Sequence, residues 1–152
     1  MHKFEALGIA KAISAGQKYG SEPYYTHVVN VELTGSRMFN LTWDNTMACA
    51  AYLHDVLEDT QVTANDLLGI GVPSDVVDIV ELLTKDKNLR YFQNIARIID
   101  SGNIKAMKVK LADNYSNSMA NDDPSKSHLR GKYSTSIQML SAAIINLENK
   151  NG

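Results

Sequence analysis

The sequence predicts an all-α protein, a compact helical bundle formed by a single domain. Apolar residues recur at three- and four-residue spacing through most of the chain, which is the pattern of amphipathic helices. Runs in which apolar and polar residues alternate between turn residues, the pattern of β-strands, are scarce. The 152 residues have the length of one ordinary domain and contain no internal repeat and no evident linker, so we expect residues 1–152 to fold as one unit.

The first half of the chain carries successive helix signals. The opening segment is amphipathic over residues 2–18, and helical periodicity continues in 26–35 and 43–57. Thr63 and Asp66 resemble a weak capping box, which predicts the start of a short helix that ends at Gly69. The first four predicted helices therefore lie near residues 2–18, 26–35, 43–57 and 63–69.

The second half has clearer apolar stripes. After the start signal at Pro73, the residues Val76, Ile79 and Leu83 follow at helical spacing. A stripe of isoleucines then ends at the turn 101–103, and a last stripe predicts a long helix that closes the core. The remaining predicted helices, which bring the total to seven or eight, lie near residues 74–84, 89–101, 103–120 and 131–149.

Composition excludes several classes of function. The formal net charge of −2 leaves no broad cationic field, so we expect neither a nucleic-acid partner nor binding to an anionic membrane. The sequence contains no run of 18 or more apolar residues, so it predicts no membrane span. The N-terminal segment also lacks the pattern of a signal peptide. The single cysteine, Cys49, favours a reducing compartment and a cytoplasmic protein, and we expect it in the core.

The stretch AYLHDVLEDT places one histidine and three carboxylates within six residues. It holds His54, Asp55, Glu58 and Asp59, and positions three or four apart share one face of a helix. Carboxylates held this close require a cation or a raised pKa. Imidazole and carboxylate ligands without a thiolate favour Mn²⁺, Fe²⁺, Zn²⁺ or Mg²⁺. On this segment alone, the alternative is a polar helix end that faces solvent.

Two further segments extend the pattern. PYYTH contains His27, and VKLADNYSN places Asp113 after an apolar run where a buried carboxylate would need a partner. With these segments the sequence resembles the HD superfamily of metal-dependent phosphohydrolases. More narrowly, it resembles the (p)ppGpp hydrolase domain of RelA/SpoT proteins and their small stand-alone relatives. The matching segments are GQ (16–17), EPYYTH (22–27), AYLHDVLEDT (50–59), LTK (83–85), VKLADNYSN (109–117) and KYSTSIQML (132–140).

The resemblance implies a helical HD-type fold and roles for individual residues. It implies one divalent metal ion, with Mn²⁺ favoured, and it implies a pair of acidic residues that position or activate the attacking water. The implied metal ligands are His27, His54, Asp55 and Asp113, and the acidic pair is Glu58 and Asp59.

The resemblance also implies contacts with a nucleotide. Asn117 matches the asparagine that contacts the nucleotide in the family. The other candidates lie near the matched motifs, and each has an ordinary surface or core role as its alternative. They are Lys18, Tyr24, Lys85, Arg130 and Lys132.

The sequence departs from the family on the substrate side. The turn before EPYYTH is shorter and less basic than usual, Val28 stands where proline is common, and NYSNS lacks the usual arginine and histidine. The leading hypothesis is removal of the 3′-pyrophosphate from a guanosine alarmone, and a 5′-nucleotidase or deoxynucleotide triphosphohydrolase is the alternative. A catalytically silent nucleotide-binding module also stays open, as does a homo-oligomer.

Overall fold

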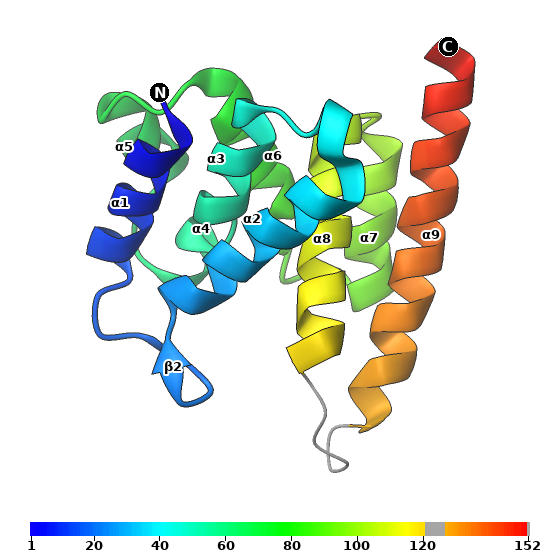
Figure 1. Ribbon diagram of the computed structural model, residues 1–152, viewed down its shortest axis with the longest axis horizontal. Coiled ribbons are helices and arrows are strands. Elements are labelled where there is room, and N and C mark those ends of the chain that lie inside the picture. The colour runs from blue at the N-terminus through cyan, green and yellow to red at the C-terminus, as the bar shows by residue number, and fades with distance from the viewer. Residues whose placement is uncertain (121–126, 152) are drawn as a thin grey trace.

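The computed structural model describes residues 1–120 and 127–151, and it is almost entirely helical (Figure 1). This confirms the predicted all-α class. In chain order the helices are α1 (Lys3–Ile13), α2 (Tyr25–Phe39), the short 3₁₀ helix η1 (Asn40–Thr42), α3 (Asn45–Leu53), α4 (Val56–Asp59), α5 (Ala64–Gly69), α6 (Ser74–Leu83), α7 (Tyr91–Asp100), α8 (Ile104–Ala120) and α9 (Ser127–Asn151).

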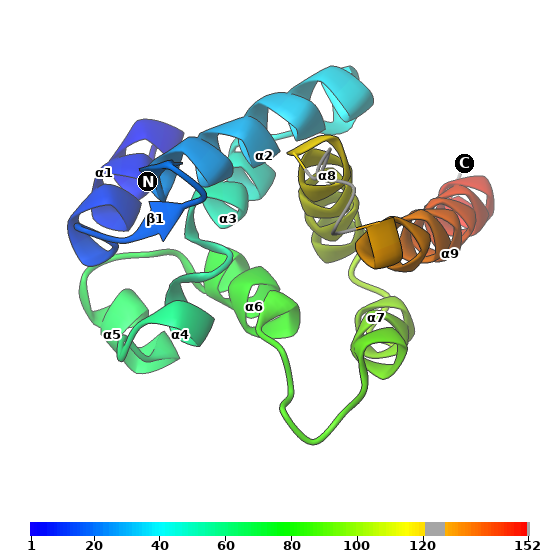
Figure 2. The same ribbon diagram turned by 90° about the horizontal axis from the view of Figure 1, so that it is seen from below.

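Helix α3 is the centre of the bundle. Its residues from Met47 to Leu53 are all buried, because α1, α2, α6 and α8 pack around it. Cys49 is a free cysteine in this buried run, as expected. Seen from below, α1 to α6 form one group and α7 to α9 another, with α8 lying between α2 and α9 (Figure 2).

Two predicted helices needed correction. The segment predicted as one helix over residues 2–18 ends at Ile13, and a small antiparallel hairpin of β1 (Lys18–Tyr19) and β2 (Glu22–Pro23) follows. Gly16 and Gly20 have φ of 85° and 62°, values that favour glycine, so the chain turns here and does not continue as a helix. The helix predicted over 43–57 is interrupted after Leu53, and His54 and Asp55 lie in the break.

A close contact ties the end of α2 to the segment that enters α3. Gly35 lies against the ring of Trp43, and a Cβ atom at this position would overlap the ring atoms. The indole nitrogen of Trp43 also donates a hydrogen bond to the buried carboxylate of Glu32 at 3.4 Å. Across the described residues, no helix combines the length and the apolar character that crossing a bilayer demands.

Candidate active site

Three separate parts of the fold bring two imidazoles and two carboxylates together. They belong to His27 on α2, His54 and Asp55 between α3 and α4, and Asp113 on α8. Oδ1 of Asp113 lies 3.1 Å from Nε2 of His27 and 3.3 Å from Nε2 of His54. Oδ2 of Asp55 lies 3.1 Å from Nε2 of His54 and 4.0 Å from Nε2 of His27. The structure therefore brings all four predicted ligands to one point.

The donor atoms fit a divalent cation. Nδ1 of His54 lies 2.7 Å from the carbonyl oxygen of Ala51 and donates to it, so in the neutral ring Nε2 carries a lone pair. That Nε2 atom is buried and makes no hydrogen bond of good geometry within the described residues, although it faces two carboxylates. One ligand atom each from His27, His54 and Asp55 lie within 4.8 Å of one another. Lone pairs converging on one point in this way suit a metal ion.

The negative charge of the two carboxylates also favours a cation bound in the cluster. Burial lowers the pKa of His54, but the carboxylates of Asp55 and Asp113 outweigh burial and raise that pKa well above its ordinary value. Burial raises the pKa of Asp113, but Lys110 and the histidines hold it well below its usual range. Two ionised carboxylates at this depth need a cation beside them.

Residues around the ligands hold the two carboxylates in place. The hydroxyl of Tyr24 donates to Oδ2 of Asp55 at 2.6 Å, and burial together with Asp55 raises the pKa of Tyr24. Nζ of Lys110 donates to Oδ2 of Asp113 at 3.1 Å, and the side-chain amide of Asn117 donates to Oδ1 at 3.2 Å. Tyr24 and Asn117 were expected at the nucleotide, and the structure gives both of them bonds to ligand carboxylates.

The acidic pair lies on α4, one turn beyond the ligands. Oε1 of Glu58 accepts a hydrogen bond from the backbone N–H of Lys85 at 2.8 Å, which fixes one side of that carboxylate. Burial raises the pKa of Asp59, and the neighbouring charges of Asp55 and Glu58 raise it further. Both side chains line the same cavity as His27, Asp55 and Asp113.

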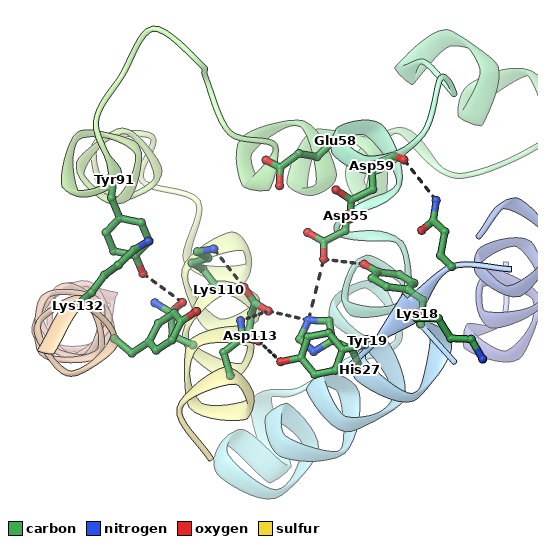
Figure 3. Close-up of a pocket in the computed structure, with 15 residues that line it drawn as sticks. Lys18, Tyr19, His27, Asp55, Glu58, Asp59, Tyr91, Lys110, Asp113 and Lys132 are labelled. Carbon is green, nitrogen blue, oxygen red and sulfur yellow. Dashed lines mark hydrogen bonds and ion pairs between the residues drawn. The ribbon is translucent and has the colours of Figure 1, made fainter. Parts of the chain in front are cut away.

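Three of the predicted ligands, His27, Asp55 and Asp113, line the floor of a polar cavity of about 600 Å³, and His54 lies buried beside them (Figure 3). One wall holds the acidic pair, and the opposite wall holds Tyr91 and two lysines, Lys110 and Lys132. Tyr24 also lines the cavity. A smaller cavity of about 190 Å³ adjoins it. The large cavity thus offers acids on one side and cations on the other.

The predicted substrate contacts fall in different places. Lys18 lines the large cavity at its edge, on the far side of Tyr19 from Asp113 (Figure 3). Lys132 lines both cavities, whereas Lys85 lines the smaller one. Arg130 is exposed on α9 and is not one of the residues that line either cavity. The role of each in binding stays a prediction.

Two residues that contact the predicted ligands directly, Lys110 and Tyr19, were not predicted. Lys110 precedes Asp113 by three positions, so helical spacing alone places both on one face of α8. Tyr19 contacts His27 from the hairpin, and the sequence gives no local signal for this contact.

The fold and the cluster together define a class of protein. A helical bundle in which a His-Asp pair meets a further histidine and a further aspartate is an HD-type domain. No family model matches the chain. Similar proteins and a solved structure do match it, and they narrow the class.

Three curated relatives carry closely related names. The chain is 32% identical over 130 residues to a probable guanosine-3′,5′-bis(diphosphate) 3′-pyrophosphohydrolase of Mycoplasma pneumoniae, a match that covers 74% of this chain and 17% of that protein. It is 35% identical over 98 residues to the guanosine-3′,5′-bis(diphosphate) 3′-pyrophosphohydrolase MESH1 of Drosophila melanogaster, covering 62% of this chain and 54% of that protein. A Borreliella burgdorferi enzyme of the same name is 30% identical over 123 residues, covering 75% of this chain and 18% of the enzyme. The matched region is thus about half of the fly protein and less than a fifth of each bacterial one.

The solved structure extends the likeness to the whole fold. It is a metazoan ortholog of SpoT, described as hydrolysing ppGpp and acting in starvation responses. It matches with a TM-score of 0.69 and 23% identity over 99% of this chain and 95% of its own. By sequence the chain is similar to these three pyrophosphohydrolases over most of its own length, and its fold is the helical HD-type fold of the solved structure.

Proposed function

We propose that the chain is a divalent-metal-dependent phosphohydrolase. Its preferred reaction would remove the 3′-pyrophosphate from (p)ppGpp-like guanosine alarmones and give GDP or GTP and pyrophosphate. The observation that carries this proposal is the convergence of two imidazoles and two carboxylates at one point, where three of these four side chains line a polar cavity. The names of the three relatives support the choice of substrate.

Four side chains would hold one metal ion, namely His27, His54, Asp55 and Asp113. Mn²⁺ is our first choice, and Fe²⁺, Zn²⁺ and Mg²⁺ suit the same oxygen and nitrogen donors. When bound, such an ion lowers the pKa of a water molecule and balances negative charge on phosphate oxygens. The fit rests on the buried Nε2 of His54, which faces two carboxylates and has no hydrogen-bond partner in the part of the chain that the structure describes.

The acidic pair would handle the proton of the attacking water. Glu58 and Asp59 both line the cavity, and either carboxylate would orient the water or accept its proton. The bond from the N–H of Lys85 limits the motion of Glu58, which suits an orienting role. The raised pKa of Asp59 suits a group that accepts a proton and gives it up again.

The phosphates would lie toward the opposite wall. Lys110 and Lys132 place their positive charges there, across the cavity from Glu58 and Asp59 (Figure 3). A substrate that spans the cavity would therefore set its leaving group against the lysines and its scissile bond above the floor. A small-molecule nucleotide fits a cavity of about 600 Å³, and the net charge of −2 gives no reason to expect nucleic acid.

The test is product analysis with Mn²⁺-loaded protein and ppGpp, with GDP and pyrophosphate resolved by chromatography. We expect both products from the wild type. Asp55→Asn should reduce turnover by more than the roughly 10–100-fold typical of changes outside the ligand shell. Asp78→Asn, an exposed acid on α6, is the matched control and should leave turnover unchanged. Full activity in Asp55→Asn would overturn the assignment.

A second HD activity is favoured by one feature of the site. In the hairpin before His27, Lys18 is the single lysine or arginine, so this edge of the cavity is poorly suited to a highly charged alarmone. A panel of ppGpp, GTP, dGTP and GMP separates the possibilities, because only the alarmone hydrolase should prefer the 3′-pyrophosphate. Binding of ppGpp without any product would instead indicate the silent nucleotide-binding module.

The cytoplasmic location expected from the single cysteine belongs to the same proposal. Formation of a homo-oligomer stays a prediction. Size-exclusion chromatography with light scattering would test it.

A further inference from the structure

Tyr19, in the β1–β2 hairpin, contacts the metal site from two directions. Its ring stacks on the imidazole of His27, with the ring centroids 4.4 Å apart and an interplanar angle of 20°. Its hydroxyl donates a hydrogen bond to Oδ1 of Asn117 at 2.5 Å. A tyrosine hydroxyl keeps its proton at neutral pH, and here that proton points to an amide oxygen, which can only accept.

The bond to Asn117 continues to a ligand. The amide nitrogen of Asn117 donates to Oδ1 of Asp113 at 3.2 Å. This is the same oxygen that lies 3.1 Å and 3.3 Å from Nε2 of the two histidines. A hydroxyl donor on one side and a carboxylate acceptor on the other fix which way the amide of Asn117 points.

His27 needs support that its own hydrogen bonds do not supply. A histidine that binds a metal usually donates its second ring N–H to a carbonyl or carboxylate, and this bond orients the ring. His54 has such a bond, from Nδ1 to the carbonyl of Ala51. Nδ1 of His27 is buried and has no hydrogen-bond partner among the described residues. The ring of His54 also contacts His27 edge-on, with the centroids 5.4 Å apart, but the ring of Tyr19 is closer, stacks on the imidazole and so limits its rotation.

The hairpin holds Tyr19 in this place. Tyr19 pairs with Glu22 across the strands, Gly20 makes the tight turn with φ of 62°, and the backbone N–H of Tyr24 bonds to the carbonyl of Gln17 at 3.0 Å. Tyr24, which follows the hairpin, bonds to Asp55. One short segment thus reaches the ligands on both sides of the cluster.

We propose that Tyr19 is a positioning residue for the metal site, which orients His27 by stacking and Asp113 through Asn117. The inference rests on the proposed function only in requiring that the site binds a divalent cation. It does not depend on the identity of the substrate.

Mn²⁺ affinity, measured by electron paramagnetic resonance without nucleotide, tests the inference. Tyr19→Leu removes both contacts and should weaken Mn²⁺ binding by about 10–100-fold, the usual effect of a residue that orients a ligand. Tyr19→Phe keeps the stacked ring and should weaken binding by less than Tyr19→Leu. Tyr115→Phe, an exposed tyrosine on α8, is the matched control and should bind Mn²⁺ like the wild type.

A double variant isolates the path through Asn117. If the Tyr19 hydroxyl acts through Asn117, then Tyr19→Phe should cause no further loss of affinity in a protein that already carries Asn117→Ala. An equal loss in both backgrounds would overturn this path. Wild-type affinity in Tyr19→Leu would overturn the whole inference.

The melting temperature in EDTA, compared with the Mn²⁺ affinity, distinguishes a positioning role of Tyr19 from a role in folding alone. Hydrolysis of ppGpp by the wild type tests the proposed reaction separately. If Tyr19 only stabilised the fold, Tyr19→Leu would lower the melting temperature in EDTA and leave the Mn²⁺ affinity of the folded protein unchanged, which would also overturn the inference. A wild type that binds Mn²⁺ but does not hydrolyse ppGpp would overturn the proposed reaction and leave the role of Tyr19 standing.

Discussion

Lys110 and the metal ion should stabilise the same carboxylate, and replacing the lysine tests this directly. Nζ of Lys110 lies 3.1 Å from Oδ2 of Asp113, and the two side chains are 20% and 8% exposed. Burial lowers the pKa of Lys110, but Asp113 outweighs burial and raises it above its ordinary value, so the lysine is charged at neutral pH. Lys110→Met keeps most of the aliphatic stem and removes only the charge.

The size of the effect follows from this burial. Removing one partner of a buried ion pair costs about 3–5 kcal/mol, and the partial exposure of Lys110 places the loss at the lower end, about 3 kcal/mol. For a chain of this length that loss lowers the melting temperature by roughly 6–12 °C. With Mn²⁺ bound, a second cation neutralises Asp113, so we expect the loss to shrink to about 1–2 kcal/mol.

Urea unfolding at neutral pH, in EDTA and again with saturating Mn²⁺, measures both losses. Lys105→Met is the matched control on α8, because Lys105 pairs with Asp44 at 2.7 Å but is 42% exposed. The control should lose no more than about 1 kcal/mol, and equally in both conditions. A loss for Lys110→Met that is the same with and without Mn²⁺ would refute the shared neutralisation of Asp113.

Two further predictions concern the scaffold. Partial burial raises the pKa of Asp44, but its hydrogen bonds, first that with Lys105, outweigh burial and lower the pKa below 3.8. The ionised Asp44 therefore stabilises the fold above pH 3.8. This stabilisation is lost as the pH falls through the lowered pKa. Asp44→Asn should be less stable than the wild type by up to about 1 kcal/mol in urea unfolding at pH 7, with the difference gone near pH 2, and a difference that persists there would contradict the charge as its cause. Gly35→Ala should lose roughly 1–2 kcal/mol, because overpacking against Trp43 exceeds the helix preference of alanine. Gly8→Ala, which has open space around its Cβ, should instead gain up to about 1 kcal/mol, and urea unfolding followed by the fluorescence of Trp43 compares the two.

Apolar periodicity predicted the helices that pack one face on the core. The prediction of 74–84 matches α6 (Ser74–Leu83), and that of 103–120 matches α8 (Ile104–Ala120), each within one residue. The hairpin was missed because strands of two residues are too short for alternation to appear. The ligand set came from the resemblance, whereas Tyr19 depends on contacts between the hairpin, α2 and α8 that no local pattern records.

The break between α3 and α4 explains how the side chains of two adjacent residues, His54 and Asp55, meet at one point. On a continuous helix, His54 and Asp55 would point about 100° apart, and the spacing would instead stack His54 with Glu58. The helix ends at Leu53 and resumes at Val56, and Asp55 has φ of −100° and ψ of 0°.

In this conformation Oδ2 of Asp55 lies 3.1 Å from Nε2 of His54, while Glu58 faces the backbone N–H of Lys85. Apolar residues flank the break on both sides, Leu53 before it and Val56 after it, so periodicity alone predicts one continuous helix. Sequence periodicity therefore does not show the break that lets His54 and Asp55 converge. The same break separates the two proposed ligands of AYLHDVLEDT from the acidic pair, Glu58 and Asp59, which follows it on α4.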